Sequence, residues 1–184
     1  MQRQRVRVNG DRLRATLEAL SAFGRPPGGG FQDGVSRTAY SDADVSGRAD
    51  AIDQMRAAGL DPRIDTAGNI IGMRPGAVIG LKPISIGSHI DSVRAGGNFD
   101  GDVGSMGALE TLRTLDEKGI KTRHPIEMAI WSNEEGGTVG STAFAGMLAP
   151  DALEQIYYGV SLRHGLKIIG GDAERLGETA RQPG

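Results

Sequence analysis

The spacing of hydrophobic residues divides this chain into segments with a helical period and segments with a strand period. Leucines at i, i+4 and i+7 predict a first helix over residues 11–23. Ser41 is a favourable N-cap for a second helix, and Gly59 lies where such a helix would end. The stripe predicted to be buried on this second helix consists of Val45, Ala49, Ile52 and Met55.

After Gly59 the apolar positions alternate with a period of two, which is typical of strands. Residues 63–65 and 70–73 flank the turn-forming segment 66–69, a pattern that predicts a hairpin. The elements predicted downstream are strands over 83–88 and 126–131, and helices over 103–118, over 141–148 and around Leu162, Leu166 and Ile169. Strands that alternate with amphipathic helices predict an α/β domain, a layered mixed sheet with flanking helices.

Composition and charge narrow the classes of function. The 184 residues carry a formal net charge of −2, without the basic stripe of a nucleic-acid-binding protein. Cysteine is absent, which excludes disulfides and thiolate metal sites. The sequence shows no signal peptide and no apolar run long enough to span a membrane. We therefore expect a cytoplasmic protein with neither nucleic acid nor membrane as a partner.

Polar residues capable of metal chemistry follow two predicted strands and open one predicted helix. His89 and Asp91 end the strand before the long central helix, Asp100 opens that helix, and Glu134 and Glu135 follow the next strand. Each group alone has an ordinary explanation, such as a capping Asp or a solvated acid pair. Because ligand sites in such sheets gather beyond the carboxyl ends of the strands, the groups together indicate a metal site. Imidazole and carboxylate donors suit Zn, Mn, Co or Ni.

The glycines around Asp100 allow a different hypothesis, an anion-binding site at the start of the following helix. The spacing matches neither a Walker nor a Rossmann motif, so this hypothesis has little support.

Three segments together resemble a known family. Residues 87–93, 97–101 and 132–136 are similar to the metal-site motifs of the M20 metallopeptidase superfamily. More narrowly, they resemble its hydantoinase/carbamoylase branch, which contains N-carbamoyl-L-amino acid hydrolases, allantoate amidohydrolases and β-ureidopropionases. Residues 34–42 and 65–69 are also similar to segments of that branch.

The resemblance implies a role for each candidate residue. His89 would bind one divalent metal ion, Asp100 would bridge two, and Glu135 would bind the second. Glu134 would be the general base and Asp91 would orient His89. The implied reaction is hydrolysis of a linear C–N bond in a small N-carbamoyl amino acid or related ureido compound, by a metal-activated water.

The chain also departs from the family pattern. The loop after residue 136 is shorter than in the family, and the two further ligand histidines of the family lie downstream of the segments matched here. His124 and His164 are predicted to be surface residues that do not replace them. We therefore expect residues 1–184 to form the N-terminal portion of a truncated M20-type catalytic domain. The lid domain, through which family members form homodimers, would be absent. The alternative function is a catalytically inactive metal-binding fragment.

Overall fold

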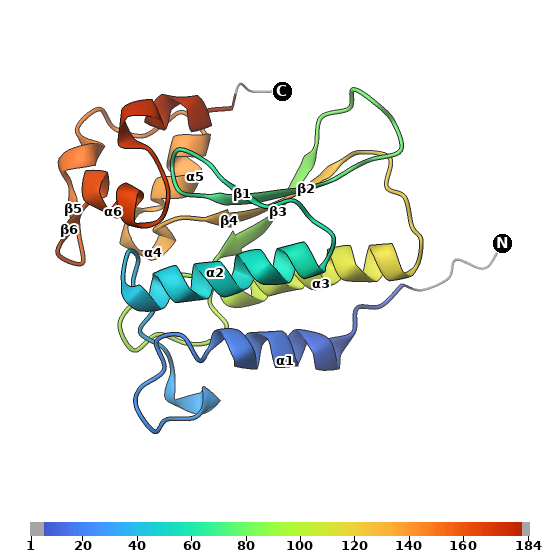
Figure 1. The fold of residues 1–184 in the computed structure, drawn as a ribbon, viewed down its shortest axis with the longest axis horizontal. Helices are drawn as coiled ribbons and strands as arrows, with labels where there is room; N and C mark the ends of the chain where they lie inside the picture. The colour runs from blue at the N-terminus through green and yellow to red at the C-terminus, as the bar shows by residue number, and fades with distance from the viewer. Residues whose placement is uncertain (1–5, 182–184) are drawn as a thin grey trace.

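The computed structural model describes residues 6–181, which form a mixed four-stranded sheet with helices packed against it (Figure 1). The sheet has the strand order β1-β2-β4-β3. Its strands are β1 (Arg63–Ile64), β2 (Ile70–Arg74), β3 (Ile84–His89) and β4 (Ile126–Trp131). β1 and β4 both run antiparallel to β2, whereas β3 and β4 are parallel. The expected α/β class with a mixed sheet is confirmed.

Three long helices lie along one side of the sheet: α1 (Gly10–Leu20), α2 (Asp42–Ala57) and α3 (Asp102–Glu117) (Figure 1). α3 packs against β3 and β4, α2 packs against β2, and α1 packs on α3. The remaining helical elements are η1 (Phe31–Asp33), α4 (Glu134–Gly137), α5 (Val139–Phe144), η2 (Ala152–Glu154), α6 (Leu162–Ile168) and η3 (Ala173–Thr179). No helix among the described residues is long and apolar enough to cross a membrane.

Two apolar cores hold these elements together. The larger core lies between the sheet and the three long helices, and it includes Leu20, Met55, Leu109, Met128 and Ile130. The smaller core lies among α5, α6 and the short hairpin of β5 (Ile156–Tyr157) and β6 (Val160–Ser161). Its members Leu162, Leu166 and Ile169 are the buried stripe that the helical period predicted.

The predicted helix boundaries are largely confirmed. Ser41 caps α2, because its hydroxyl oxygen accepts a hydrogen bond of 3.2 Å from the Asp44 amide. α1 ends three residues earlier than predicted, since the amides of Ala22 and Phe23 turn to carbonyls three residues back. The short helix predicted over 141–148 forms over Val139–Phe144 instead, with α4 before it.

The buried face predicted for α2 is confirmed at Met55 and in part at Ile52, which packs against the larger core, but it is wrong at Val45 and Ala49. Val45 and Ala49 are exposed, and the charged residues Asp44 and Arg48 are buried in their place. The helix tolerates these charges because each has a backbone partner. Asp44 accepts a hydrogen bond of 2.8 Å from the Tyr40 amide, and Arg48 donates to the carbonyl of Gly68.

Candidate metal centre

His89 is the last residue of β3 and lies opposite Trp131 of β4 in the parallel register. Its side chain is buried, and ring atom Nδ1 lies 2.9 Å from the backbone carbonyl oxygen of Asp91. A carbonyl oxygen only accepts hydrogen bonds, so Nδ1 carries the proton in this contact. In the neutral ring, Nε2 therefore keeps its lone pair, which is the form of histidine that binds a metal.

Two carboxylates from other segments face this Nε2 atom. Asp100 Oδ1, from the loop before α3, lies 3.9 Å away, and Glu134 Oε2, from the start of α4, lies 3.5 Å away. The Asp100 side chain is 75% exposed and that of Glu134 is 33% exposed, so solvent reaches both. The structure thus brings together residues that lie far apart in the sequence, at the carboxyl ends of β3 and β4.

Gly101 makes the approach of the Asp100 loop to His89 possible. Its φ of +65° lies in the left-handed region, which favours glycine. A Cβ atom at this position would lie 2.4 Å from the His89 ring. Any larger residue would push the loop or the ring away, so the close pairing of the two segments depends on this glycine.

The donors around His89 fit a divalent metal ion in chemistry and in spacing. Two ligands bound at about 2.1 Å to one tetrahedral ion lie about 3.4 Å apart, and the predicted ligand atoms His89 Nε2 and Asp100 Oδ1 are 3.9 Å apart. Imidazole with carboxylates is a donor set for Zn, Mn, Co or Ni. Within residues 6–181, however, no group of three or more such side chains is arranged to hold an ion. The described residues therefore provide part of a coordination shell.

Asp91 connects His89 to the Glu134–Glu135 turn in a way that the sequence did not predict. Its two carboxylate oxygens accept hydrogen bonds of 3.2 Å from the amides of Glu134 and Glu135. The expected hydrogen bond from the imidazole to this carboxylate is not formed, because Oδ1 is 3.7 Å from Nδ1 and the backbone carbonyl takes the ring proton. Burial raises the pKa of Asp91 to about 6, and nearby Asp44 adds to this shift.

The two glutamates occupy different places. Glu134 faces His89, whereas the half-buried Glu135 side chain makes no hydrogen bond or ion pair with another described side chain. Asn133 begins the turn with a φ of +46°, an uncommon value for a residue other than glycine. The roles of Glu134 as base and Glu135 as metal ligand stay predictions.

The remaining histidines lie where they were expected. His124 precedes β4, so it is at the opposite end of the parallel β3–β4 pair from His89, and its Nδ1 contacts the Lys82 carbonyl. His164 is exposed on α6. Neither adds a ligand to the candidate site.

Sequence reasoning missed two residues beside the site, Arg37 and Asp102. Both are buried, and they form an ion pair with a nitrogen–oxygen distance of 2.7 Å. Arg37 lies in a polar segment that resembles a surface loop, and Asp102 resembles an ordinary acid in the first turn of a helix. No local pattern distinguishes such residues from solvated ones.

Comparisons with known proteins agree with the motif assignment. The N-carbamoyl-L-amino acid amidohydrolase of Geobacillus stearothermophilus is 38% identical over 183 residues, covering 96% of this chain and 44% of that protein. The allantoate amidohydrolase of Escherichia coli K12 is 32% identical, covering 78% of this chain and 35% of that protein. The chain thus spans less than half the length of these relatives.

Solved structures of this family are also similar to the chain. The crystal structure of a hydantoinase/carbamoylase family amidase from Burkholderia ambifaria matches with a TM-score of 0.83 and 36% identity, covering 91% of this chain and 42% of that one. The resemblance to the hydantoinase/carbamoylase branch is confirmed. The family model that matches residues 69–162 is described as Peptidase family M28, where the motifs alone suggested the M20 superfamily. Because this match covers just over half of the chain, the chain belongs to peptidase family M28.

Proposed function

We propose that this chain carries part of the site of a metal-dependent amidohydrolase that cleaves a linear C–N bond in a small N-carbamoyl amino acid or related ureido compound. The observation that carries the proposal is the position of His89 Nε2, which faces Asp100 and Glu134 where β3 and β4 end. The names of the similar proteins, N-carbamoyl-L-amino acid and allantoate amidohydrolases, support the substrate class.

In this proposal three residues would hold divalent ions of the Zn, Mn, Co or Ni class. His89 would bind one ion through Nε2, Asp100 would be a ligand to both ions, and Glu135 would bind the second. When bound, such an ion polarises the substrate carbonyl and lowers the pKa of a water molecule. The carbonyl of Asp91 holds the ring of His89 with Nε2 toward the site.

Glu134 acts as the general base. Its Oε2 atom is 3.5 Å from His89 Nε2 and partly open to solvent, so a water molecule can reach it beside the ligand nitrogen. Glu134 accepts a proton from this water as the water oxygen bonds to the substrate carbonyl carbon. The same carboxyl group then donates the proton to the nitrogen that leaves as the C–N bond breaks.

A second candidate function, a metal-binding chain without turnover, is favoured by one observation. The described residues hold no group of three or more donors around one ion, whereas catalytic zinc sites generally use three protein ligands. Water can complete a shell, but it holds an ion less firmly than imidazole. We therefore expect the 184-residue chain to bind Mn²⁺ or Zn²⁺ weakly and to hydrolyse none of these substrates by itself.

The test combines metal titration with a turnover assay on the purified chain. Calorimetry would measure Mn²⁺ and Zn²⁺ affinity for the wild type, His89→Gln and the control His164→Gln, whose residue is exposed on α6. Ammonia or amine release would be followed with N-carbamoyl amino acids, allantoate and ureidopropionate. Glu134→Gln would be compared with Glu154→Gln, which changes a glutamate with a 74% exposed side chain.

The outcomes separate the two candidates. Turnover that is lost in Glu134→Gln and kept in Glu154→Gln would show that the chain is itself the hydrolase. Metal affinity that is lost in His89→Gln and kept in His164→Gln, without turnover, would support the metal-binding chain. Metal affinity that does not depend on His89 would exclude both.

A further inference from the structure

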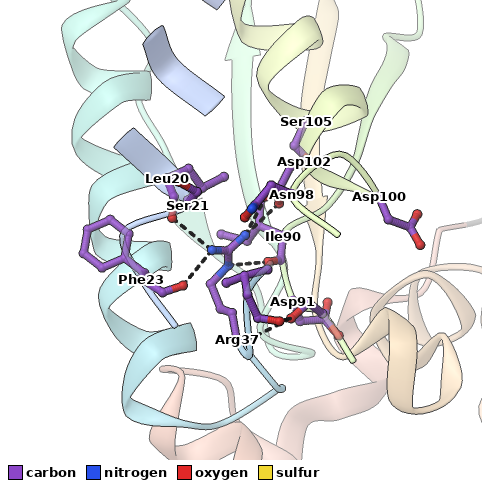
Figure 2. A network of polar contacts seen from close by, with 12 residues as sticks. Leu20, Ser21, Phe23, Arg37, Ile90, Asp91, Asn98, Asp100, Asp102 and Ser105 are labelled. Atoms are coloured by element: carbon purple, nitrogen blue, oxygen red, sulfur yellow. Dashed lines mark hydrogen bonds and ion pairs between the residues drawn. The ribbon is translucent and has the colours of Figure 1, made fainter. Parts of the chain in front are cut away.

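Arg37 is the most completely satisfied buried charge in the described part of the chain. Its side chain is fully buried between α1 and the loop before α3 (Figure 2). Nε donates to the Ile90 carbonyl at 2.6 Å, and Nη1 donates to the carbonyls of Leu20 and Phe23, each at 2.9 Å. Nη2 donates to both carboxylate oxygens of Asp102, at 2.9 and 2.7 Å. All three nitrogens of the guanidinium therefore donate hydrogen bonds.

The acceptors of Arg37 lie directly beside the candidate metal ligands. Ile90 is the residue between His89 and Asp91, and Asp102 is two residues after Asp100. One planar guanidinium thus joins the segment that carries the imidazole to the turn that carries the exposed carboxylate. Figure 2 shows Asp100 pointing away from the guanidinium, so Arg37 acts on the site through the backbone on either side.

The backbone of Arg37 is fastened to the same segment. Its amide donates to the Ser92 hydroxyl oxygen at 2.9 Å, and the Ser92 amide donates to the Arg37 carbonyl at 2.9 Å. Gly47 of α2 leaves room for the side chain, because a Cβ atom there would lie 2.8 Å from the Arg37 Cδ atom. The backbone of Arg37 is therefore fixed relative to the His89 segment, independently of the contact that its side chain makes with Asp102.

Stability alone is a weak explanation for this arrangement. The side chains of Arg37 and Asp102 are 0% and 1% exposed, so both ions lose nearly all their hydration. For such pairs the cost of desolvation often equals or exceeds the attraction between the charges. What the pair provides instead is geometry, because Nη2 binds the Asp102 carboxylate while Nε and Nη1 are held by backbone carbonyls, so the planar guanidinium has one orientation.

We propose that Arg37 is a positioning residue for the metal site: it fixes the His89 segment and the Asp100 turn relative to each other through Ile90 and Asp102. The inference rests on the proposed function for its link to metal. Its structural part, that Arg37 determines the environment of the His89 ring, does not depend on a metal.

The experiment compares the same substitution at two arginine–carboxylate pairs whose carboxylates are both buried, Arg37→Lys and Arg12→Lys. Arg12 also donates two hydrogen bonds to a buried carboxylate, that of Glu110, at 2.7 and 2.9 Å. Glu110 lies eight residues, or about 12 Å, further along α3 than Asp102. Lysine keeps the charge in both variants but removes the planar guanidinium, so Arg12→Lys controls for loss of a guanidinium–carboxylate contact away from the site.

Two measurements are made on each folded variant. The first is the NMR signal of the His89 ring without metal, assigned by its loss in His89→Gln; the signals of His124 and His164 serve as references. We expect Arg37→Lys to shift or broaden the His89 signal and Arg12→Lys to leave it unchanged. The second is Mn²⁺ affinity, which we expect to fall about 10-fold or more in Arg37→Lys only.

Each outcome has a defined meaning. The inference would be overturned if the Arg37→Lys substitution left the His89 ring signal unchanged. It would also be overturned if Arg12→Lys shifted that signal as much as Arg37→Lys does. If the His89 ring signal changed only in Arg37→Lys and the wild type bound no Mn²⁺, the positioning role would be supported. The same result would rule out the proposed function. If Arg37→Lys does not fold, the isosteric Asp102→Asn variant is judged by the same two measurements.

Discussion

The molecule contains two arginine–carboxylate pairs in which the guanidinium contacts both carboxylate oxygens, and the two pairs differ in their surroundings. Arg37 and Asp102 are both buried at the end of the sheet where the candidate site lies. Glu110 is equally buried on α3, but its partner Arg12 is 31% exposed and also reaches the exposed Glu117. The first pair lies entirely in the interior, whereas the second spans the boundary between the interior and water.

This difference changes the ionisation of the two acids. Burial raises the pKa of Asp102 to about 6, although Arg37 lowers it. The hydrogen bond from Arg12 dominates at Glu110, and the pKa of that carboxyl is held below its usual value. A pair whose cation keeps part of its hydration gains attraction at small desolvation cost, and a fully buried pair does not. We infer that the outer pair stabilises the packing of α1 on α3, and that the inner pair serves the site.

The largest expected effect comes from removing the cation of each pair. Arg37→Met leaves the Asp102 carboxylate buried without a cation and the carbonyls of Ile90 and Phe23 without this donor, so we expect a loss of about 3–5 kcal/mol in unfolding free energy. Arg12→Met should cost about 1–2 kcal/mol, because Glu110 keeps hydrogen bonds from the Asn9 amide and the Thr114 hydroxyl. Urea denaturation followed by circular dichroism would measure both. Equal losses would mean that burial of the cation does not distinguish the pairs.

Two helix glycines provide a finer comparison. In Gly47→Ala the new methyl group would press on the Cδ atom of Arg37, and we expect a loss of about 1–3 kcal/mol. In Gly107→Ala of α3 the methyl group meets no atom within 4 Å, so helix propensity should stabilise the protein by about 1 kcal/mol. Urea midpoints would show the opposite signs. Stabilisation by Gly47→Ala would show that the Arg37 side chain is free to move aside.

The sequence predicted those parts of the molecule that local periodicity controls. The alternation of Ile126, Met128 and Ile130 predicted β4 with the boundaries found in the structure. The candidate ligands His89 and Asp100 were also predicted to lie at one edge, because the βαβ order places consecutive parallel strands with their carboxyl ends together.

Buried charges could not be predicted, because their partners are distant in the sequence. Arg37 and Asp102 are 65 residues apart, and each occurs in a segment typical of the surface. The same difficulty made the first half of the predicted buried face of α2 wrong, since Asp44 and Arg48 resemble solvated residues until their backbone partners are known. A pattern based on hydrophobicity assigns every charge to solvent, and this fold keeps several charges inside.

The smallest predicted effect concerns the pH dependence of the outer pair. The pKa of Glu110 is lower in the folded protein than its usual value of about 4.3, so the unfolded chain binds the proton more readily. The stability that the ionised carboxylate contributes is therefore fully present above about pH 5–6, and it is lost as the pH falls through 4.3 toward the lower, folded value. Glu110→Gln removes this titration and keeps a side chain of nearly the same shape.

The difference in unfolding free energy between the wild type and Glu110→Gln should thus be constant near neutral pH, at about 1 kcal/mol, and should shrink as the solution becomes acidic. Urea titrations at several pH values between about 3 and 7 would measure it. Glu154→Gln is the matched control, because the Glu154 side chain is 74% exposed and its contact with Arg163 is long, at 3.5 Å. Substitution at this exposed position should give no pH-dependent difference in unfolding free energy.

If the difference in unfolding free energy between the wild type and Glu110→Gln stayed constant down to pH 3, Arg12 would not hold the carboxylate ionised. The partial hydration of Arg12 would then not explain how the Arg12–Glu110 pair differs from the fully buried Arg37–Asp102 pair.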